Sequence, residues 1–308
     1  MNSPLALLAL VVFPSGLFLL GMGLAYEWAD RKLLALLQNR VGPRWFQPLA
    51  DLIKLLAKEE IFPEKANKLL FIGLPIVALA GGLTAALYVP IAGIKPAYGF
   101  PGDLIVTLYL LSLLTLCLGL AGTNTLDRFS MIGATRTLTQ VFSYEAPFLL
   151  ALLIPAATAG SWQIGDIATY AQSHWLILIQ PVGFMVGLIG LMGKLEMPPF
   201  DAPEAHTEIS AGALTEYSGR GLALFQLAKA VELIIGLTLM AAIYLGGVSN
   251  PLWFLVKTLA LLLLLVGIQS LLTRLRIDQT VGLWWRYGTI LVLLQWLVVI
   301  LVKRMGSL

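Results

Sequence analysis

Five carboxylates lie close together in a polar segment that interrupts a strongly apolar sequence. The segment runs from residue 196 to residue 220, and its acids are Glu196, Asp201, Glu204, Glu208 and Glu216. Negative charge beside a lipid bilayer is costly unless it is neutralised or used. Carboxylates crowded in a medium of low dielectric constant hold protons more tightly, which is the property that a proton relay requires. The segment is therefore predicted to take part in proton transfer.

The spacing of these acids also allows a plainer interpretation. Asp201, Glu204 and Glu208 are three and four residues apart, so a helix would place them on one face. The Asp201–Glu204 spacing is that of a capping box, in which the two acids simply start a helix. Capping does not explain Glu208 or Glu216. His206 lies among them and titrates near neutral pH, so it joins the candidate proton path.

Three further ionisable residues lie inside long apolar runs. Glu145 has no basic neighbour in sequence, whereas Lys229 and Glu232 have the i, i+3 spacing of a helical ion pair. An ionisable side chain at membrane depth is functional by default, because desolvation penalises it strongly. Glu145 and Glu232 are therefore predicted to continue the chain of protonatable groups into the membrane. The structural alternatives are a Lys229–Glu232 ion pair without function and a Glu145 that is satisfied by a neighbouring helix.

The rest of the sequence supplies the elements that must position these residues. The chain has 308 residues, of which 58% are hydrophobic and 12% charged, and apolar runs long enough to cross a bilayer recur. This pattern predicts an all-α, polytopic membrane protein and excludes a β-barrel, whose strands alternate instead. The single cysteine excludes an internal disulfide and a cysteine-ligated cluster within this chain. We expect no metal or cofactor to be bound by this chain alone.

We predict one integral membrane domain over residues 1–308, with about eight transmembrane helices. Their approximate bounds are 4–26, 69–90, 103–123, 139–159, 175–193, 221–245, 251–272 and 283–302. Fifteen of the 20 lysines and arginines fall in the odd-numbered connections between these spans or, in the case of Arg286, directly beside one. Because cytoplasmic loops carry an excess of basic residues, these connections, including the acid-rich loop 194–220, are predicted to be cytoplasmic. Both termini then lie on the opposite face of a prokaryotic cytoplasmic membrane.

A helix with one narrow polar stripe is predicted directly after the first span. Its polar residues Gln47, Asp51 and Lys54 are four and three positions apart, and leucine and isoleucine fill most of the rest. Such a helix lies at the membrane surface. The alternative is a short buried helix that packs on the bundle.

Three arginines in the predicted cytoplasmic connections form a basic group, namely Arg40, Arg128 and Arg136. The bias of basic residues toward the cytoplasm is enough to explain them as ligands of lipid phosphates. They are also suited to anchor a partner subunit.

Several motifs, taken in order, resemble those of one family. They are Asn39-Arg-Val-Gly-Pro, the 47–59 helix, Ser143-Tyr-Glu-Ala-Pro, Pro199-Phe-Asp-Ala-Pro-Glu-Ala-His-Thr-Glu and Thr215-Glu-Tyr-Ser-Gly. These motifs are similar to those of the core membrane chain 1 of respiratory complex I, which is called the H subunit in bacteria. That family includes the homologous membrane subunit of energy-converting, membrane-bound nickel–iron hydrogenases. The resemblance covers essentially the whole chain.

The resemblance implies a non-catalytic subunit of a multi-subunit oxidoreductase, which docks a peripheral electron-transfer arm onto a proton-pumping membrane arm. Its expected partners are a hydrogenase-like or quinone-reductase large subunit, an Fe–S subunit, antiporter-like membrane subunits and lipid. Nickel–iron and Fe–S centres are expected in those partners, and quinone at the interface. Arg40 and the 47–59 helix would lie at the docking surface and chamber entrance. The acids that would line the proton path are Glu145, Asp201, Glu204, Glu208 and Glu216.

Three departures from the complex I pattern favour the hydrogenase branch, in which no quinone need bind. Met197-Pro198 stands where an arginine is usual, His206 replaces an acid, and residues 116–122 lack an expected acid. The alternative within the family is the H subunit of complex I itself, forming the quinone cavity. Alternatives of other classes are a stand-alone secondary transporter and a purely structural anchor. Internal repeats would favour the transporter, and the two halves show no convincing repeat.

Overall fold

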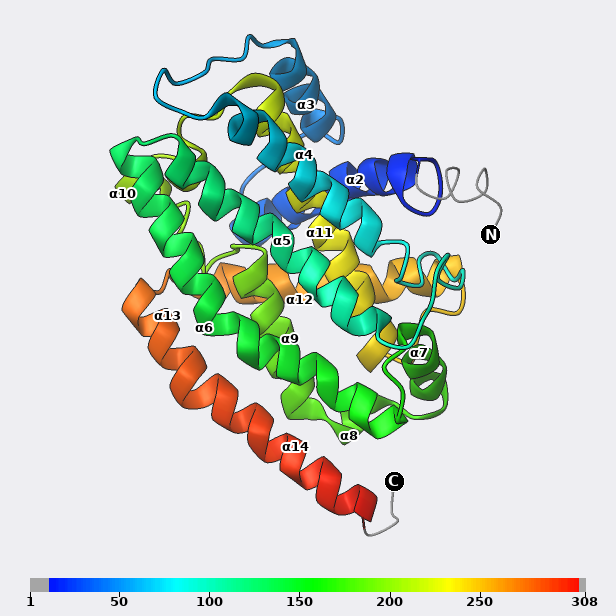
Figure 1. Cartoon of the computed structure of the whole chain (residues 1–308). Coiled ribbons are helices and arrows are strands. Elements are labelled where there is room, and N and C mark those ends of the chain that lie inside the picture. Colours follow the sequence, from blue (N-terminus) through cyan, green and yellow to red (C-terminus); the bar gives the residue numbers. More distant parts are fainter. Residues whose placement is uncertain (1–10, 305–308) are drawn as a thin grey trace.

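The computed structural model describes residues 11–304, without the side chains of residues 206 and 207. This part of the chain is built from helices and turns and contains no strand, so the predicted all-α membrane fold is confirmed (Figure 1). The elements are α2 (Gly16–Leu37), α3 (Gln47–Ala57), α4 (Lys68–Ala85), α5 (Asp103–Asn124), α6 (Arg128–Ala159), α7 (Ile164–Ser173), α8 (Leu176–Ile179), α9 (Pro181–Lys194), α10 (His206–Ile209), η1 (Gly212–Leu214), α11 (Gly219–Tyr244), α12 (Pro251–Leu271), α13 (Ile277–Leu283), η2 (Trp284–Gly288) and α14 (Thr289–Arg304).

Six of the described helices are long and apolar enough to cross a membrane. They are α4, α5, α6, α11, α12 and the continuous helix Ile277–Arg304, which includes a π-helical turn at η2. The predicted span 175–193 is interrupted, since α8 ends at Ile179 and α9 begins at Pro181. Pro181 cannot donate the backbone hydrogen bond that would join the two helices. The start of the predicted span 4–26 lies outside the described residues.

Two helices begin or end well away from the predicted bounds. The first described helix, α2, continues to Leu37, and the ion pair between Glu27 and Arg31 joins successive turns of this extension. Helix α6 begins at residue 128, because the Asp127 carboxylate accepts hydrogen bonds from the backbone N–H groups of Phe129 and Ser130. Arg128 and Arg136 are therefore helical residues. Helix α7 was not predicted from the sequence.

The four odd-numbered connections between the predicted spans, which carry most of the basic residues, meet on one face of the bundle. The first contacts the third through Asn67 N–H and Asn124 Oδ1, at 3.2 Å, and the fifth through Ile61 N–H and Ser218 Oγ, at 3.4 Å. The fifth contacts the seventh, where Leu275 N–H donates to Pro199 O at 3.0 Å. The odd-numbered connections therefore share a face, as the distribution of basic residues predicts. Helix α7 lies toward the opposite end of the bundle (Figure 1).

Helix α11 is the centre of the packing, and nearly every residue from Val231 to Tyr244 is buried. It contacts α2, α4, α9 and α12. The approach to α2 is close, because a Cβ at Gly23 would lie only 3.2 Å from Ala230 Cβ. Glu232, which lies in this stretch, is therefore enclosed by other helices, whereas Lys229, just before it, is only partly buried.

Candidate functional site

The acid-rich segment is mostly irregular chain, so the helix that the spacing of its acids would allow does not form. Residues 201–205 form turns, and α10 contains only the four residues His206–Ile209. The residue that precedes α10 is Ala205, and no side chain caps the helix, so the predicted capping box does not form. The three acids consequently do not share one helical face: Asp201 and Glu208 face arginines, whereas Glu204 faces Lys229. The side chain of His206, a predicted member of the proton path, lies outside the described residues.

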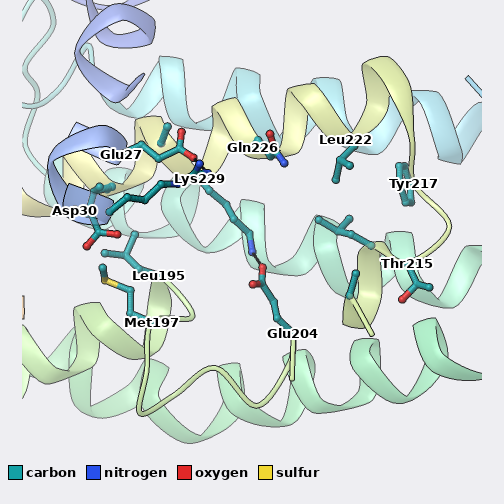
Figure 2. Close-up of a pocket in the computed structure, with 15 residues that line it drawn as sticks. Glu27, Asp30, Leu195, Met197, Glu204, Thr215, Tyr217, Leu222, Gln226 and Lys229 are labelled. Atoms are coloured by element: carbon teal, nitrogen blue, oxygen red, sulfur yellow. Dashed lines mark hydrogen bonds and ion pairs between the residues drawn. The ribbon is translucent and has the colours of Figure 1, made fainter. Parts of the chain in front are cut away.

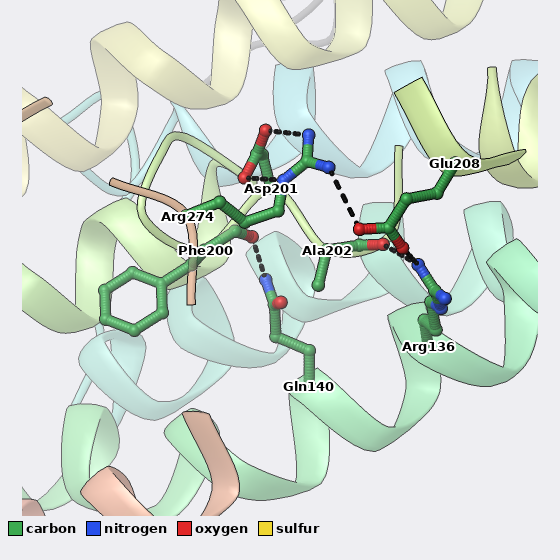
Figure 3. A network of polar contacts seen from close by, with 7 residues as sticks. All are labelled: Arg136, Gln140, Phe200, Asp201, Ala202, Glu208 and Arg274. Carbon is green, nitrogen blue, oxygen red and sulfur yellow. Dashed lines mark hydrogen bonds and ion pairs between the residues drawn. The ribbon is translucent and has the colours of Figure 1, made fainter. Parts of the chain in front are cut away.

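Two of these acids are held by arginines in a network that anchors the segment (Figure 3). Arg274, from the connection after α12, binds Asp201 in a two-pronged geometry, with Nε–Oδ1 at 2.8 Å and Nη2–Oδ2 at 2.5 Å. The same guanidinium lies 3.6 Å from Glu208. Arg136 from α6 binds the other oxygen of Glu208 at 2.7 Å. The hydrogen bond from Arg136 lowers the pKa of the Glu208 carboxyl below its ordinary value.

Gln140 of α6 holds the start of the acid-rich segment in place through two hydrogen bonds. Its buried Nε2 donates to Gly193 O at 3.0 Å and to Phe200 O at 2.7 Å. Asp201 and Glu208 are thus held in a network of polar contacts, and their place in the proton path stays a prediction.

Glu204 and Glu196 turn the other way, toward the bundle, and share one cation. Lys229 Nζ from α11 lies 2.6 Å from Glu196 Oε2 and also donates to Glu204. Glu196 is nearly fully buried, and this burial raises the pKa of its carboxyl, although the Lys229 charge opposes the shift. The predicted i, i+3 ion pair between Lys229 and Glu232 is absent from the described contacts. Lys229 bonds the acid-rich segment instead.

A cavity of about 590 Å³ lies between α2, α11 and the acid-rich segment (Figure 2). One part of its wall is charged and the other is apolar. The charged residues are Glu27, Asp30, Arg31, Glu204 and Lys229, and the apolar ones include Leu195, Met197, Leu214, Leu222 and Leu233. Such a chamber suits a small amphipathic molecule.

The contribution of α2 to this cavity was not predicted from the sequence. The first span was predicted to end at residue 26, so Glu27, Asp30 and Arg31 were counted with a cytoplasmic loop. The available signal was their spacing, because acids three residues apart on a continuing apolar helix share one face. Oδ1 of Asp30 is buried and has no hydrogen-bond partner among the described residues.

Helix α3 is linked to the cavity through Arg31. Gln47 donates to Asp51 at 2.8 Å, and Asp51 lies 3.4 Å from the Arg31 guanidinium. Of the α3 residues only Pro48 is buried, which contradicts the alternative of a short buried helix. Asp51 therefore lies one contact behind the cavity wall and Gln47 two contacts behind it, on an amphipathic helix with an exposed apolar face.

A second group of ionisable side chains lies deeper, among α5, α6, α9 and α11. The Lys194 side chain at the end of α9 is fully buried, and its Nζ lies 3.7 Å from Glu145 Oε2 and 3.2 Å from Ser112 Oγ. Ser112 from α5 donates a hydrogen bond to Glu145. Glu232 of α11 is also buried, and Lys194 is one of the charged groups that act on it through space. Glu145 thus has partners on neighbouring helices that the sequence did not indicate, while its Oε2 makes no hydrogen bond within the described residues.

The remaining predicted site residues lie outside both groups. Arg40, Lys54 and Arg128 are exposed. Glu216 is half-buried, and no ion pair within the described part of the chain includes it. No group of three or more histidine, cysteine, aspartate or glutamate side chains in that part is placed to hold a metal ion.

Comparison with known proteins identifies the family. Residues 8–300 match the family described as NADH dehydrogenase. The chain is 34% identical to the NADH-quinone oxidoreductase H subunit of Carboxydothermus hydrogenoformans, over 92% of this chain and 85% of the relative. It is 35% identical to the corresponding protein of Thermomicrobium roseum, over 87% of each chain.

A solved structure shares the fold. It is that of the membrane-bound sulfane sulfur reductase, an archaeal respiratory membrane complex, one chain of which aligns with a TM-score of 0.85 and 24% identity. The alignment covers 96% of this chain and 98% of that one. The resemblance predicted from the sequence motifs is confirmed, and the chain belongs to the family of the NADH-quinone oxidoreductase H subunit.

Proposed function

We propose that this chain is the membrane subunit of a redox-driven ion pump related to respiratory complex I. It connects an electron-transfer arm, docked at the charged face, to an ion path inside the membrane. The observation that carries the proposal is the continuity between the cavity and the buried charges. Lys229 and Glu204 line the cavity, and Lys229 also binds the buried Glu196. Glu232 interacts electrostatically with Glu196 and Lys229 near the cavity, and with Lys194 and Glu145 deeper in the bundle.

The charged face is the proposed docking surface, and we place it on the cytoplasmic side. Arg40, Lys54 and Arg128 are exposed cations in the connections that meet there. A partner subunit with acidic patches would be attracted to them, since complementary charges steer association. Antiporter-like membrane subunits would receive ions at the far end of the path, near Glu145.

The proposed coupling is electrostatic. Reduction of a group at the cavity changes the charge beside Lys229, and a charge there acts on Glu196 and Glu204, which it binds directly. Charge interactions in a poorly solvated interior are several times stronger than in water. A change in protonation at the cavity therefore reaches Glu232, and from there Glu145.

The test uses the intact complex reconstituted in vesicles. Glu145→Gln and Glu232→Gln should each abolish ion uptake driven by electron transfer, while the complex still assembles and transfers electrons. Asp278→Asn is the matched control, because Asp278 is an exposed carboxylate outside the proposed path. Normal ion uptake by both membrane variants would exclude the path.

A second candidate function, quinone binding in the cavity, is favoured by the lining of the chamber. A quinone has a polar ring and an apolar tail, and the wall offers charged residues and a set of leucines. The relatives at 34% and 35% identity are also named quinone oxidoreductase subunits. Leu222→Trp, which fills part of the cavity, should weaken binding of a quinone analogue to the intact complex. Unchanged binding by this variant would place the quinone elsewhere.

The sequence departures that favour a hydrogenase remain a prediction about the partner. Purification of the complex tests it directly. A large subunit with nickel-ligating cysteines indicates a hydrogenase, whereas a large subunit without them indicates quinone or another acceptor.

A further inference from the structure

Lys194 is the buried cation that the proposed path leaves without a role. Its side chain is fully enclosed, and its ammonium group faces the ring of Phe148 at 5.9 Å. The 3.7 Å separation from Glu145 Oε2 is an ion-pair distance but exceeds that of a hydrogen bond. A buried ammonium needs compensation by an opposite charge. Glu145 supplies it only in part, and Glu232 is the second carboxylate within its electrostatic reach.

The same pattern occurs nearer the cavity. Lys229 binds both Glu196 and Glu204. Lys194 likewise acts on two carboxylates, since it pairs with Glu145 at 3.7 Å and attracts Glu232 without direct contact. Four carboxylates therefore face two lysines. Glu196 and Glu232 are buried, and an uncompensated buried charge is strongly unfavourable, so each of them needs either the positive charge of a lysine or a proton.

Resting on the proposed function, we propose that the path consists of two Glu–Lys–Glu units in series and that Lys194 is the counter-ion of the inner one. In this role Lys194 is a positioning residue: it stabilises one carboxylate of the Glu145–Glu232 pair while the other carries the proton. Uptake of a proton by Glu145 then requires its release from Glu232, or the reverse. Glu145 Oε2 and Glu232 Oε1 are both buried and make no hydrogen bond within the described residues, so each has an oxygen available for the proton.

The inner unit differs from an ordinary structural ion pair in one testable respect. A structural pair stabilises the complex and leaves the ratio of ions moved to electrons transferred unchanged. A counter-ion shared by two proton carriers determines that ratio, since neither carboxyl group releases its proton readily without the nearby positive charge.

The experiment compares Lys194→Met with Lys194→Arg in the intact complex, with ion uptake per electron as the measurement. Lys194→Met should lower the ratio by roughly tenfold or more, because removal of one partner leaves the other buried charge uncompensated. Lys194→Arg keeps the charge and should retain a substantial part of the ratio. Lys257→Met is the matched control: Lys257 is a partly buried lysine of α12 whose Nζ donates to Gly246 O and Gly247 O, not to a carboxylate.

The outcomes separate this inference from the proposed function. If Glu145→Gln and Glu232→Gln abolish ion uptake but Lys194→Met keeps the wild-type ratio, the path stands and the counter-ion role is wrong. If all three variants keep that ratio, the path itself is wrong. Should Lys194→Met fail to assemble, the double variant Lys194→Met/Glu145→Gln decides. It removes one charge of each sign, so the inference predicts recovered assembly without ion uptake, and a failure to recover overturns it.

Discussion

Lys229 Nζ lies 2.6 Å from Glu196 Oε2, and this contact joins the core helix α11 to the irregular segment that follows α9. Lys229 also lines the cavity and binds Glu204 on its wall. One lysine thus contacts both the chamber and the first buried carboxylate. A change at the cavity can act on Glu196 without any movement of the helices.

Lys229→Met should destabilise the complex. Removal of one partner from a fully buried ion pair costs about 3–5 kcal/mol. The Lys229 side chain is 26% exposed, so we expect a value toward the lower end of that range. The midpoint of thermal unfolding of the purified complex measures the effect. Lys54→Met, at an exposed lysine of α3, is the control, and equal midpoints for the two variants would contradict the prediction.

Arg274→Lys should loosen the acid-rich segment although it keeps the charge. An arginine binds both oxygens of Asp201 at once, and the single ammonium group of a lysine does not reproduce that geometry. A charge-assisted hydrogen bond contributes about 1.5–3 kcal/mol. Loss of one bond should therefore speed amide hydrogen exchange in residues 201–210 by roughly tenfold or more. Arg276→Lys is the control, because the Arg276–Asp278 pair is exposed.

The Glu208 network should make the structure sensitive to acid. The folded-state pKa of Glu208 lies below its ordinary value of 4.5, chiefly because Arg136 donates a hydrogen bond to the carboxylate. A group with a lowered pKa stabilises the fold above its unfolded-state pKa, and this contribution is lost as the pH falls through the folded-state pKa. Unfolding midpoints should therefore fall below about pH 4.5, and less steeply in Glu208→Gln. A Glu216→Gln control should follow the wild type, and identical pH profiles for all three proteins would refute the assignment.

The fold was largely predictable from the sequence, because helix-forming apolar runs are a local property. The runs that contain Glu145, Lys229 and Glu232 all became helices at the predicted places. The structure differs from the sequence-based expectation where a local spacing pattern competes with a contact to a residue distant in sequence. The helix that the Asp201–Glu204 spacing would allow does not form: the Asp201 carboxylate binds Arg274, a residue distant in sequence, and the chain around Asp201 turns.

The partners within the site were not predictable in the same way. Glu232 lies one helical turn from Lys229, yet Lys229 bonds Glu196, which is 33 residues away in sequence. Whether a lysine turns along its own helix or toward a neighbouring loop depends on packing that spacing does not encode. Lys194 was assigned to a charged connection because it follows an apolar run. Only the approach of α5 and α6 to the end of α9 makes it buried.

Gly133→Ala should disturb the cavity from outside it. A Cβ at Gly133 would lie 2.4 Å from Ala213 N and 2.5 Å from Gly212 C, so the backbone of the η1 turn must move. Overpacking of this kind costs about 1–3 kcal/mol. The neighbouring Ala211 and Leu214 line the cavity, so binding of any cavity ligand should weaken together with stability.

Gly21→Ala is the matched control, because a Cβ at Gly21 of α2 meets no atom within 4 Å. There the gain in helix propensity is about 1 kcal/mol, which should leave stability equal or higher. Unfolding midpoints and ligand affinity of the two variants decide the matter, and a Gly133→Ala complex as stable as Gly21→Ala would show that the turn does not rest on α6.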